Sequence, residues 1–246
     1  MRSWTIALGL LVAVAAGVAI GARLRFSPAP EGERPAAPRA DAGAVHHRVV
    51  AREGLHVDLF VPPPAAAPAP LLLFVHERGW PAPDEREREG AAIAEALQQR
   101  GIAVAVLSYA MKDGAPPRAV GEEIVATIRE LAARAAELGI DARPVLAGDE
   151  AGATLVAALA LDARYGLAPS AIRGVVGLNG IYDGSAEPPD PDSPRAHVRA
   201  DAPPFLVLSA HGDSPRAAES SRAFARALER AGAKEVRAHH VSLRDA

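Results

Sequence analysis

From about residue 45 onward, short apolar runs alternate with longer amphipathic stretches. Leu71 to Val75 are five consecutive apolar residues, which is typical of a strand buried on both faces of a parallel sheet. Residues 55–61 alternate between apolar and polar positions, which predicts a strand with one buried face. Further strands are predicted over 46–50, 103–108, 145–147, 174–178, 205–209 and 236–243.

Helical periodicity fills the stretches between these runs. Apolar residues recur every three or four positions from Val120 to Leu138, which predicts an amphipathic helix over about 118–138, ended by Gly139. Two more helices are predicted over about 84–99 and 219–230. Strands alternating with helices predict an α/β fold with a mainly parallel, doubly wound sheet. Ligands of such sheets bind at the carboxyl ends of the strands.

One predicted turn between a strand and a helix carries a recognisable motif. Residues 144–154 read PVLAGDEAGAT, with Gly148 and Gly152 four positions apart. This is the frame of the nucleophile elbow G-x-S-x-G. Its glycines let the strand and the helix approach each other, and its central residue has a strained backbone. The central residue here is Glu150, where a serine is expected.

Composition excludes several classes of function. The net charge of −3 gives no sign of nucleic-acid binding. The absence of cysteine excludes disulfides, thiolate metal sites and a cysteine nucleophile. No spacing of histidines and carboxylates resembles a metal-ligand motif, so neither a metal nor a cofactor is expected. Arginine supplies most of the 27 basic residues, which together with abundant alanine and proline indicates a GC-rich bacterial gene.

The N-terminal region predicts export or membrane anchoring. Trp4 to Ala22 form an apolar run between Arg2 and Arg23, about the length of 17–25 residues that a membrane-spanning helix needs. Small residues near Gly21 also suit cleavage by a signal peptidase. We therefore expect a signal anchor or signal peptide over 1–25, a Pro/Ala-rich linker over 26–44 and a folded domain over 45–246. The expected location is the bacterial cell envelope, either membrane-anchored or exported, on a side that the flanking arginines leave open.

The folded domain resembles the α/β-hydrolase superfamily, most closely the carboxylesterase-like esterase/lipase branch with an H-G-G-G-W oxyanion loop. The resemblance covers nearly all of residues 46–246. LLLFVHERGW (71–80) is similar to the strand and oxyanion loop, and ELGIDARPVLAGDEAG (137–152) to the approach to the elbow. The other similar stretches are AVAVLSYAM (103–111), GVVGLNGIYD (174–183) and SPRAHVRADAPPFLVLSAHGD (193–213).

The resemblance assigns the catalytic triad to three positions of this chain. The order of the triad is Ser, Asp or Glu, then His. Glu150 stands at the nucleophile position and Asp213 at the acid position. Ala246 stands where the general-base histidine is expected, so that histidine is lost.

The oxyanion loop departs from the family pattern as well. His76 and Gly79 match the pattern, whereas Glu77 and Arg78 replace glycines. Ala151, the residue after the nucleophile position, should supply the second oxyanion N–H group. Either Arg78 neutralises Glu77 or Glu150, or Glu77 and Arg78 face solvent. Trp80 is expected to pack beneath the loop or to wall a ligand site.

These departures leave three functional hypotheses. The first is a membrane-tethered, catalytically impaired module that binds a small molecule in the former active-site pocket or acts as a scaffold. The second is an active hydrolase of carboxylic esters with rearranged groups. The third uses Glu150 as a carboxylate nucleophile and needs a displaced base such as His211 or His240. His239 and His240 point to opposite faces of their strand, and Ser209 and Thr154 have no base at a recognisable spacing.

Overall fold

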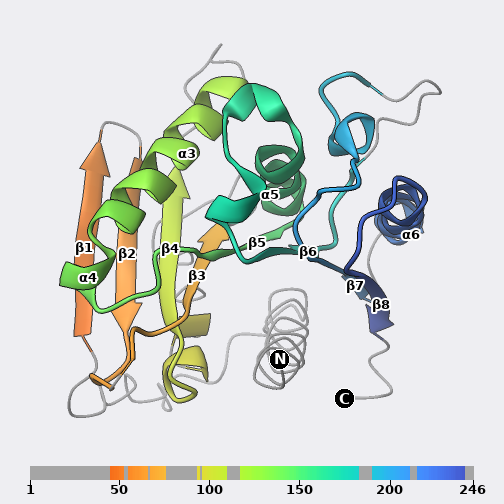
Figure 1. The fold of residues 1–246 in the computed structure, drawn as a ribbon. Helices are drawn as coiled ribbons and strands as arrows, with labels where there is room; N and C mark the ends of the chain where they lie inside the picture. Colours follow the sequence, from red (N-terminus) through yellow and green to blue (C-terminus); the bar gives the residue numbers. More distant parts are fainter. Residues whose placement is uncertain are drawn as a thin grey trace, which may run out of the picture.

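A single sheet of eight strands organises the domain. The computed structural model describes residues 45–52, 55–65, 67–75, 93–94, 96–109, 117–182, 190–210 and 215–241. The strand order is β1-β2-β4-β3-β5-β6-β7-β8 (Figure 1). The strands are β1 (Val45–Arg52), β2 (Leu55–Val61), β3 (Leu71–Val75), β4 (Ala103–Tyr109), β5 (Val145–Asp149), β6 (Gly174–Leu178), β7 (Phe205–Ala210) and β8 (Val236–Val241).

The pairing of the strands confirms the predicted mainly parallel sheet. Strands β3 to β8 pair in parallel. Strands β1 and β2 form an antiparallel edge beside β4. All five side chains of β3 are buried, which explains its continuous apolar run. Successive side chains point to opposite faces, so Leu73 joins one core cluster while Leu72 and Phe74 join another.

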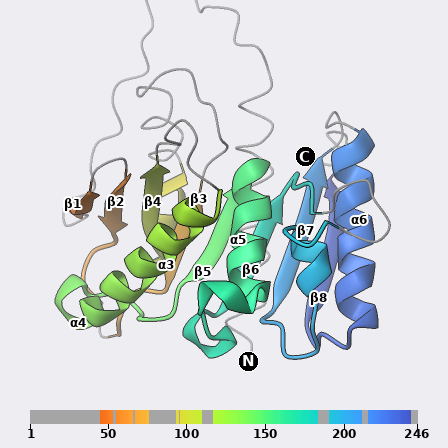
Figure 2. The same ribbon diagram turned by 90° about the horizontal axis from the view of Figure 1, so that it is seen from above.

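The longer described helices cover one face of the sheet (Figure 2). They are α3 (Pro117–Ala133), α5 (Ala151–Leu161) and α6 (Pro215–Arg230), with the short α4 (Ala135–Leu138) following α3. Their apolar side chains share one core cluster with Leu73 and Val75. On the other face, the described helical residues belong to the segment 93–98, and Ile93, Ala94 and Leu97 pack there.

Two helix boundaries differ from the sequence prediction. The single helix predicted over 118–138 is broken at Arg134, whose φ of −100° and ψ of 7° are not helical. The side chain of Arg134 donates a hydrogen bond to the Val49 carbonyl oxygen at 3.0 Å, a long-range contact that helical periodicity does not reveal. Helix α6 begins at Pro215, four residues before the predicted start, because proline favours the first helical position.

Membrane anchoring of the N-terminal region stays a prediction. Within the part of the chain that the structure describes, no helix is both long enough and apolar enough to cross a bilayer. The apolar run from Trp4 to Ala22 lies outside that part, as does the beginning of the helix predicted over 84–99.

An aromatic contact fixes α6 against the loop that follows β6. The Phe224 ring is fully buried and stacks on Tyr182 with ring centroids 4.3 Å apart. Phe205 of β7 meets the same ring edge-on at 5.6 Å. The Tyr182 amide also donates a hydrogen bond to the Ser220 hydroxyl at 2.9 Å. These contacts join β6, β7 and α6 into one packed unit.

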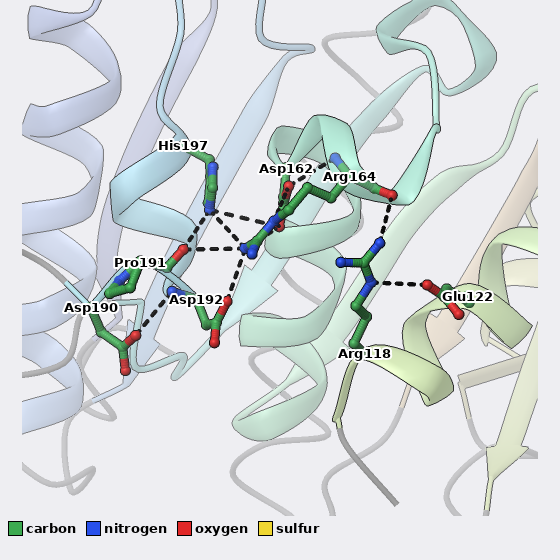
Figure 3. A network of polar contacts seen from close by, with 8 residues as sticks. All are labelled: Arg118, Glu122, Asp162, Arg164, Asp190, Pro191, Asp192 and His197. Atoms are coloured by element: carbon green, nitrogen blue, oxygen red, sulfur yellow. Dashed lines mark hydrogen bonds and ion pairs between the residues drawn. The ribbon is translucent and has the colours of Figure 1, made fainter.

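A charged network holds the C-terminal end of α5 (Figure 3). The Arg164 guanidinium lies 2.7 Å from the Asp162 carboxylate and 2.9 Å from the Asp192 carboxylate. The His197 Nε2 atom lies 3.6 Å from the Asp162 carboxylate. Because Asp192 and His197 belong to the segment before β7, the network fastens that segment to α5.

Acid should weaken this network by protonating the Asp162 carboxylate, whose side chain is only 6% exposed. Burial alone would raise the pKa of Asp162, but hydrogen bonds from Arg164 and the nearby His197 ring hold the pKa below its ordinary value. The resulting stabilisation is complete above the unfolded-state pKa of about 3.9 and is lost as the pH falls through the folded-state pKa. Asp162→Asn should therefore lower the free energy of unfolding by about 2 kcal/mol at pH 7.

The pH dependence provides the sharper measurement. Urea denaturation between pH 5 and pH 2 should show a shallower loss of stability in Asp162→Asn than in the wild type. Asp201→Asn is the matched control, because the Asp201 side chain is 73% exposed, and it should follow the wild-type curve. Equal slopes for Asp162→Asn and the wild type would contradict the prediction.

Candidate functional site

The turn between β5 and α5 has the backbone geometry of a nucleophile elbow. Glu150 connects the strand to the helix with a φ of 46° and a ψ of −107°. A positive φ is uncommon for any residue other than glycine, and such strain persists only where the surroundings impose it. The Glu150 amide donates a hydrogen bond to the Leu178 carbonyl oxygen at 2.8 Å. The strained turn is therefore present although no serine occupies it.

Close packing of the strand and the helix imposes this strain. A Cβ atom placed on Gly148 would lie 2.4 Å from the backbone carbonyl carbon of Gly152 and 2.7 Å from the Ala153 amide nitrogen. Both contacts are with backbone atoms, which cannot rotate aside. Residue 148 must be glycine for α5 to begin where it does, which gives a steric reason for that part of the motif.

Polar side chains at the ends of β5 and β6 support the elbow. The Asp149 carboxylate accepts hydrogen bonds from the Glu150 amide at 3.0 Å and from the Asn179 side chain at 3.3 Å. Asn179 is 4% exposed and has a φ of 54°. Burial raises the pKa of the Tyr182 hydroxyl, and the charge on Asp149 raises it further. Two adjacent carboxylates, Asp149 and Glu150, thus lie at the carboxyl end of β5.

A second polar pair lies on β7 and β8. The Ser209 hydroxyl and the His240 Nδ1 atom are 3.0 Å apart, and the two residues are opposite each other in the parallel register. Ser209 therefore has a histidine beside it, although no base stands at a recognisable spacing from it in the sequence. The pairing depends on a strand register that links residues 31 positions apart, and the local sequence contains no signal for it.

His240 lies too far from the elbow strand to activate Glu150 from its position in β8. Strands β6 and β7 separate β5 from β8, and three spacings between neighbouring strands amount to about 14 Å. Side chains of strands project roughly perpendicular to the sheet, so they do not bridge such a lateral distance. His239 and His240 also point to opposite faces, as their adjacency in a strand requires.

Several predicted site residues lie outside the described part of the chain, so their roles stay predictions. Gly148, Glu150, Ala151 and Gly152 are described and together form the elbow. Among the described residues, no group of three or more potential ligands is arranged to hold a metal ion. The residues outside the described ranges are His76, Glu77, Arg78, Gly79, Trp80, His211, Asp213 and Ala246.

A cavity of about 850 Å³ lies at the opposite end of the sheet from the elbow. Its lining includes residues 62–65 and 67–70, Gly101 and the paired side chains of Arg134 and Glu137. Residue 70 precedes β3 and residue 101 precedes β4. This cavity therefore borders the amino ends of the parallel strands. Ligands of open α/β sheets bind at the carboxyl ends, which favours the elbow as the functional site.

Comparisons with known proteins agree with this architecture. The BD-FAE family model matches residues 57–168, and a comparison with curated proteins found no match. Esterase 2 of Thermogutta terrifontis, solved after phosphoramylation by tabun, has a TM-score of 0.64 and 23% identity, over 82% of this chain and 83% of that chain.

Two further solved structures are similar in fold. Esterase Est22 has a TM-score of 0.65 and 20% identity, over 81% of this chain and 72% of its own. EstE1, a thermophilic carboxylesterase cloned from a metagenomic library, has a TM-score of 0.62 and 20% identity, over 81% of this chain and 78% of its own. Both alignments span most of the chain.

The backbone strain at Glu150 should lower the free energy of unfolding by a measurable amount. Glycine adopts a positive φ without steric cost, whereas alanine at residue 150 would keep the strain of order 1–3 kcal/mol. Glycine also loses about 0.5–1 kcal/mol more conformational entropy on folding. We therefore expect Glu150→Gly to be about 1 kcal/mol more stable than Glu150→Ala in urea denaturation. The two variants both lack the carboxylate, so a Glu150→Gly variant no more stable than Glu150→Ala would contradict the strain argument.

Proposed function

This chain is a carboxylesterase-like protein of the α/β-hydrolase fold, and on that premise we propose that it has lost serine-esterase activity and binds a small polar or cationic ligand beside Glu150. The observation that supports this proposal is the elbow itself. Its strained geometry is kept at Glu150, while the hydroxyl that would use that geometry is replaced by a carboxylate.

A carboxylate at this position does not perform the chemistry of a serine. The elbow serine attacks because its neutral hydroxyl transfers a proton to an imidazole. A glutamate side chain at its ordinary pKa is a carboxylate at pH 7, and a carboxylate has no proton to transfer. The N-terminal end of α5 begins directly after Glu150, and the positive end of a helix dipole stabilises an anion. These features favour a static negative charge at the elbow.

Two catalytic alternatives have weaker support. A carboxylate nucleophile at Glu150 requires a base that activates water against the ester intermediate. His240 on β8 is separated from the elbow strand by two other strands, which disfavours it as that base. The hypothesis of an active esterase with rearranged catalytic groups is supported only by the similarity of the fold, and fold does not determine activity.

The charges at the elbow favour a cationic or polar ligand over a neutral acyl chain. Asp149 and Glu150 are consecutive acidic residues at the carboxyl end of β5. Negative charge in this region attracts a cation and gives no attraction to a neutral acyl chain. Glu77 of the predicted oxyanion loop would add a third negative charge.

Ester hydrolysis tests the loss of activity. With p-nitrophenyl acetate, the purified wild type, Glu150→Ala and Glu150→Ser should all hydrolyse substrate at close to the rate in buffer. Glu150→Ser stays inactive in this expectation because a hydroxyl without a base keeps its proton. A wild-type rate well above that of buffer that collapses in Glu150→Ala would show that Glu150 is catalytic, and the proposal would be wrong.

Ligand binding can be tested separately by thermal shift. Small amine compounds should raise the Tm of the wild type, and fatty-acyl compounds of similar size should not. Glu150→Gln keeps the shape of the side chain and removes its charge, so it should lose the shift with amines. Stabilisation by acyl compounds alone, or an equal shift with amines in Glu150→Gln, would count against a cationic ligand at this site.

A further inference from the structure

The cavity at the amino ends of the strands has the size of a ligand site. Its volume of about 850 Å³ lies within the range of about 300–1,000 Å³ that small-molecule pockets occupy. It borders the end of the sheet opposite the elbow, and Glu150 is not among its described lining residues. The charges at the elbow therefore do not determine what this cavity binds.

The floor of the cavity is apolar and continuous with the core cluster that the helices share. Val49 of β1, Val61 of β2, Ala69 and Leu138 of α4 line the cavity, and all four pack against that cluster. Each of them is half-buried, so part of its apolar surface stays accessible. An apolar molecule that covers this surface removes it from water, which is favourable.

The walls of the cavity lose little conformational entropy when a ligand binds. The fifteen described residues that line it include five prolines, three alanines and two glycines, whose side chains have no rotamer freedom to lose on burial. The prolines lie in the loop between β2 and β3 or directly before β3, and their fixed φ stiffens its backbone. A rigid lining of this kind increases affinity, because less order must be imposed on binding.

Hydrogen bonds also fix both ends of this proline-rich loop. The Gln98 side-chain amide donates to the Val61 carbonyl oxygen at 3.1 Å, at the end of β2. The Ala103 amide donates to the Pro70 carbonyl oxygen at 2.9 Å, directly before β3. The two walls that these residues begin are thereby tied to neighbouring parts of the domain, so the cavity is preformed.

Two charged side chains supply the polar part of the lining. The Nε and Nη2 atoms of Arg134 donate to the two carboxylate oxygens of Glu137 at 3.0 Å and 2.8 Å, and Nη1 donates to the Val49 carbonyl oxygen. A guanidinium has five N–H groups, so two of them have no acceptor among the described residues. Each carboxylate oxygen of Glu137 can accept a further bond. Donors and acceptors thus lie side by side.

This lining favours a neutral ligand that has both a donor and an acceptor. An anionic ligand would be repelled by Glu137 and by Glu130, whose carboxylate lies 4.0 Å from Arg134. An ammonium group offers Arg134 no acceptor, and it loses more hydration energy than a neutral group when it enters a mostly apolar cavity. A carboxamide is neutral, its carbonyl oxygen accepts from Arg134, and its N–H group donates to Glu137.

We propose that this cavity is a second ligand site, which takes a small neutral molecule with an apolar body and a carboxamide group. The carboxamide binds at Arg134 and Glu137, and the apolar body covers the floor between the proline-rich loop and α4. This site is independent of the ligand proposed at Glu150, because the two sites lie at opposite ends of the sheet and prefer ligands of different charge.

Three aromatic probes and one matched pair of variants test the site in the full-length protein. The probes are N-benzylacetamide, which is neutral, phenylacetate, which is an anion, and phenethylamine, which is a cation. Ala67→Phe places a ring in the cavity, whose lining includes Ala67. Ala168→Phe is the control, because Ala67 and Ala168 are both exposed alanines directly before a proline and Ala168 does not line the cavity.

Ligand-detected NMR titrations then give the Kd of each probe. N-Benzylacetamide should bind the wild type with a Kd on the order of 1 mM, as the binding energy per atom of small ligands allows. Ala67→Phe should weaken this binding by about tenfold, and Ala168→Phe should leave it unchanged. The Kd values of phenylacetate and phenethylamine should be the same in Ala67→Phe as in the wild type.

A second pair of variants tests the polar contacts. Glu137→Ala should weaken the binding of N-benzylacetamide, because the acceptor for its N–H group is lost, and should strengthen the binding of phenylacetate, because Arg134 loses its carboxylate partner. Glu122→Ala is the control, since Glu122 is also an exposed carboxylate paired with an arginine and does not line the cavity. It should change neither Kd.

Three results would overturn the proposal. Equal binding of N-benzylacetamide by Ala67→Phe and the wild type would show that the cavity does not hold it. An equal loss of all three probes in Ala67→Phe would show that the cavity does not select a neutral amide. A loss in Glu150→Gln as large as that in Ala67→Phe would place the amide at the elbow. If Ala67→Phe does not fold, equal Kd values in Glu137→Ala and Glu122→Ala exclude the site.

Discussion

The contact between Gly148 and the backbone of Gly152 and Ala153 is the constraint on which the site depends. It leaves no room for a side chain at residue 148 and forces the chain to turn from β5 into α5 within a single residue. Glu150 therefore adopts a positive φ and stands where the parallel strands end. The geometry of the elbow follows from this packing, whereas the chemistry of the elbow depends on the side chain at residue 150.

The sheet transmits this constraint to the rest of the domain. Strands β3, β5 and β6 are buried on both faces, and their side chains divide between two core clusters. The Glu150 amide bonds to the end of β6, and the Asn179 amide bonds to the Leu208 carbonyl oxygen of β7. The ends of three neighbouring strands are thereby fixed relative to one another, so the residues that follow them keep a defined spacing.

Features that depend on local sequence were predictable, and features that depend on distant residues were not. Continuous apolar runs identified the strands, and the spacing of Gly148 and Gly152 identified the elbow. The break of the helix at Arg134 was missed, because it involves a bond to Val49 on the far edge of the sheet. The pair Ser209 and His240 was missed for the same reason, since parallel register sets it. The predicted oxyanion loop and acid lie outside the described residues.

The charged network at Arg164 has a consequence for the ligand binding that we propose at the other end of α5. The first turn of helix α5 packs closely against β5, and the charged network holds the end of its last turn. A helix fixed at both ends presents Glu150 as a preorganised group. Little protein conformational entropy then remains to be lost on association, so the free energy of contacts made there appears largely as affinity. If the proposed ligand binds there, discrimination between ligands should come from the shape and charge of a rigid surface and not from its rearrangement.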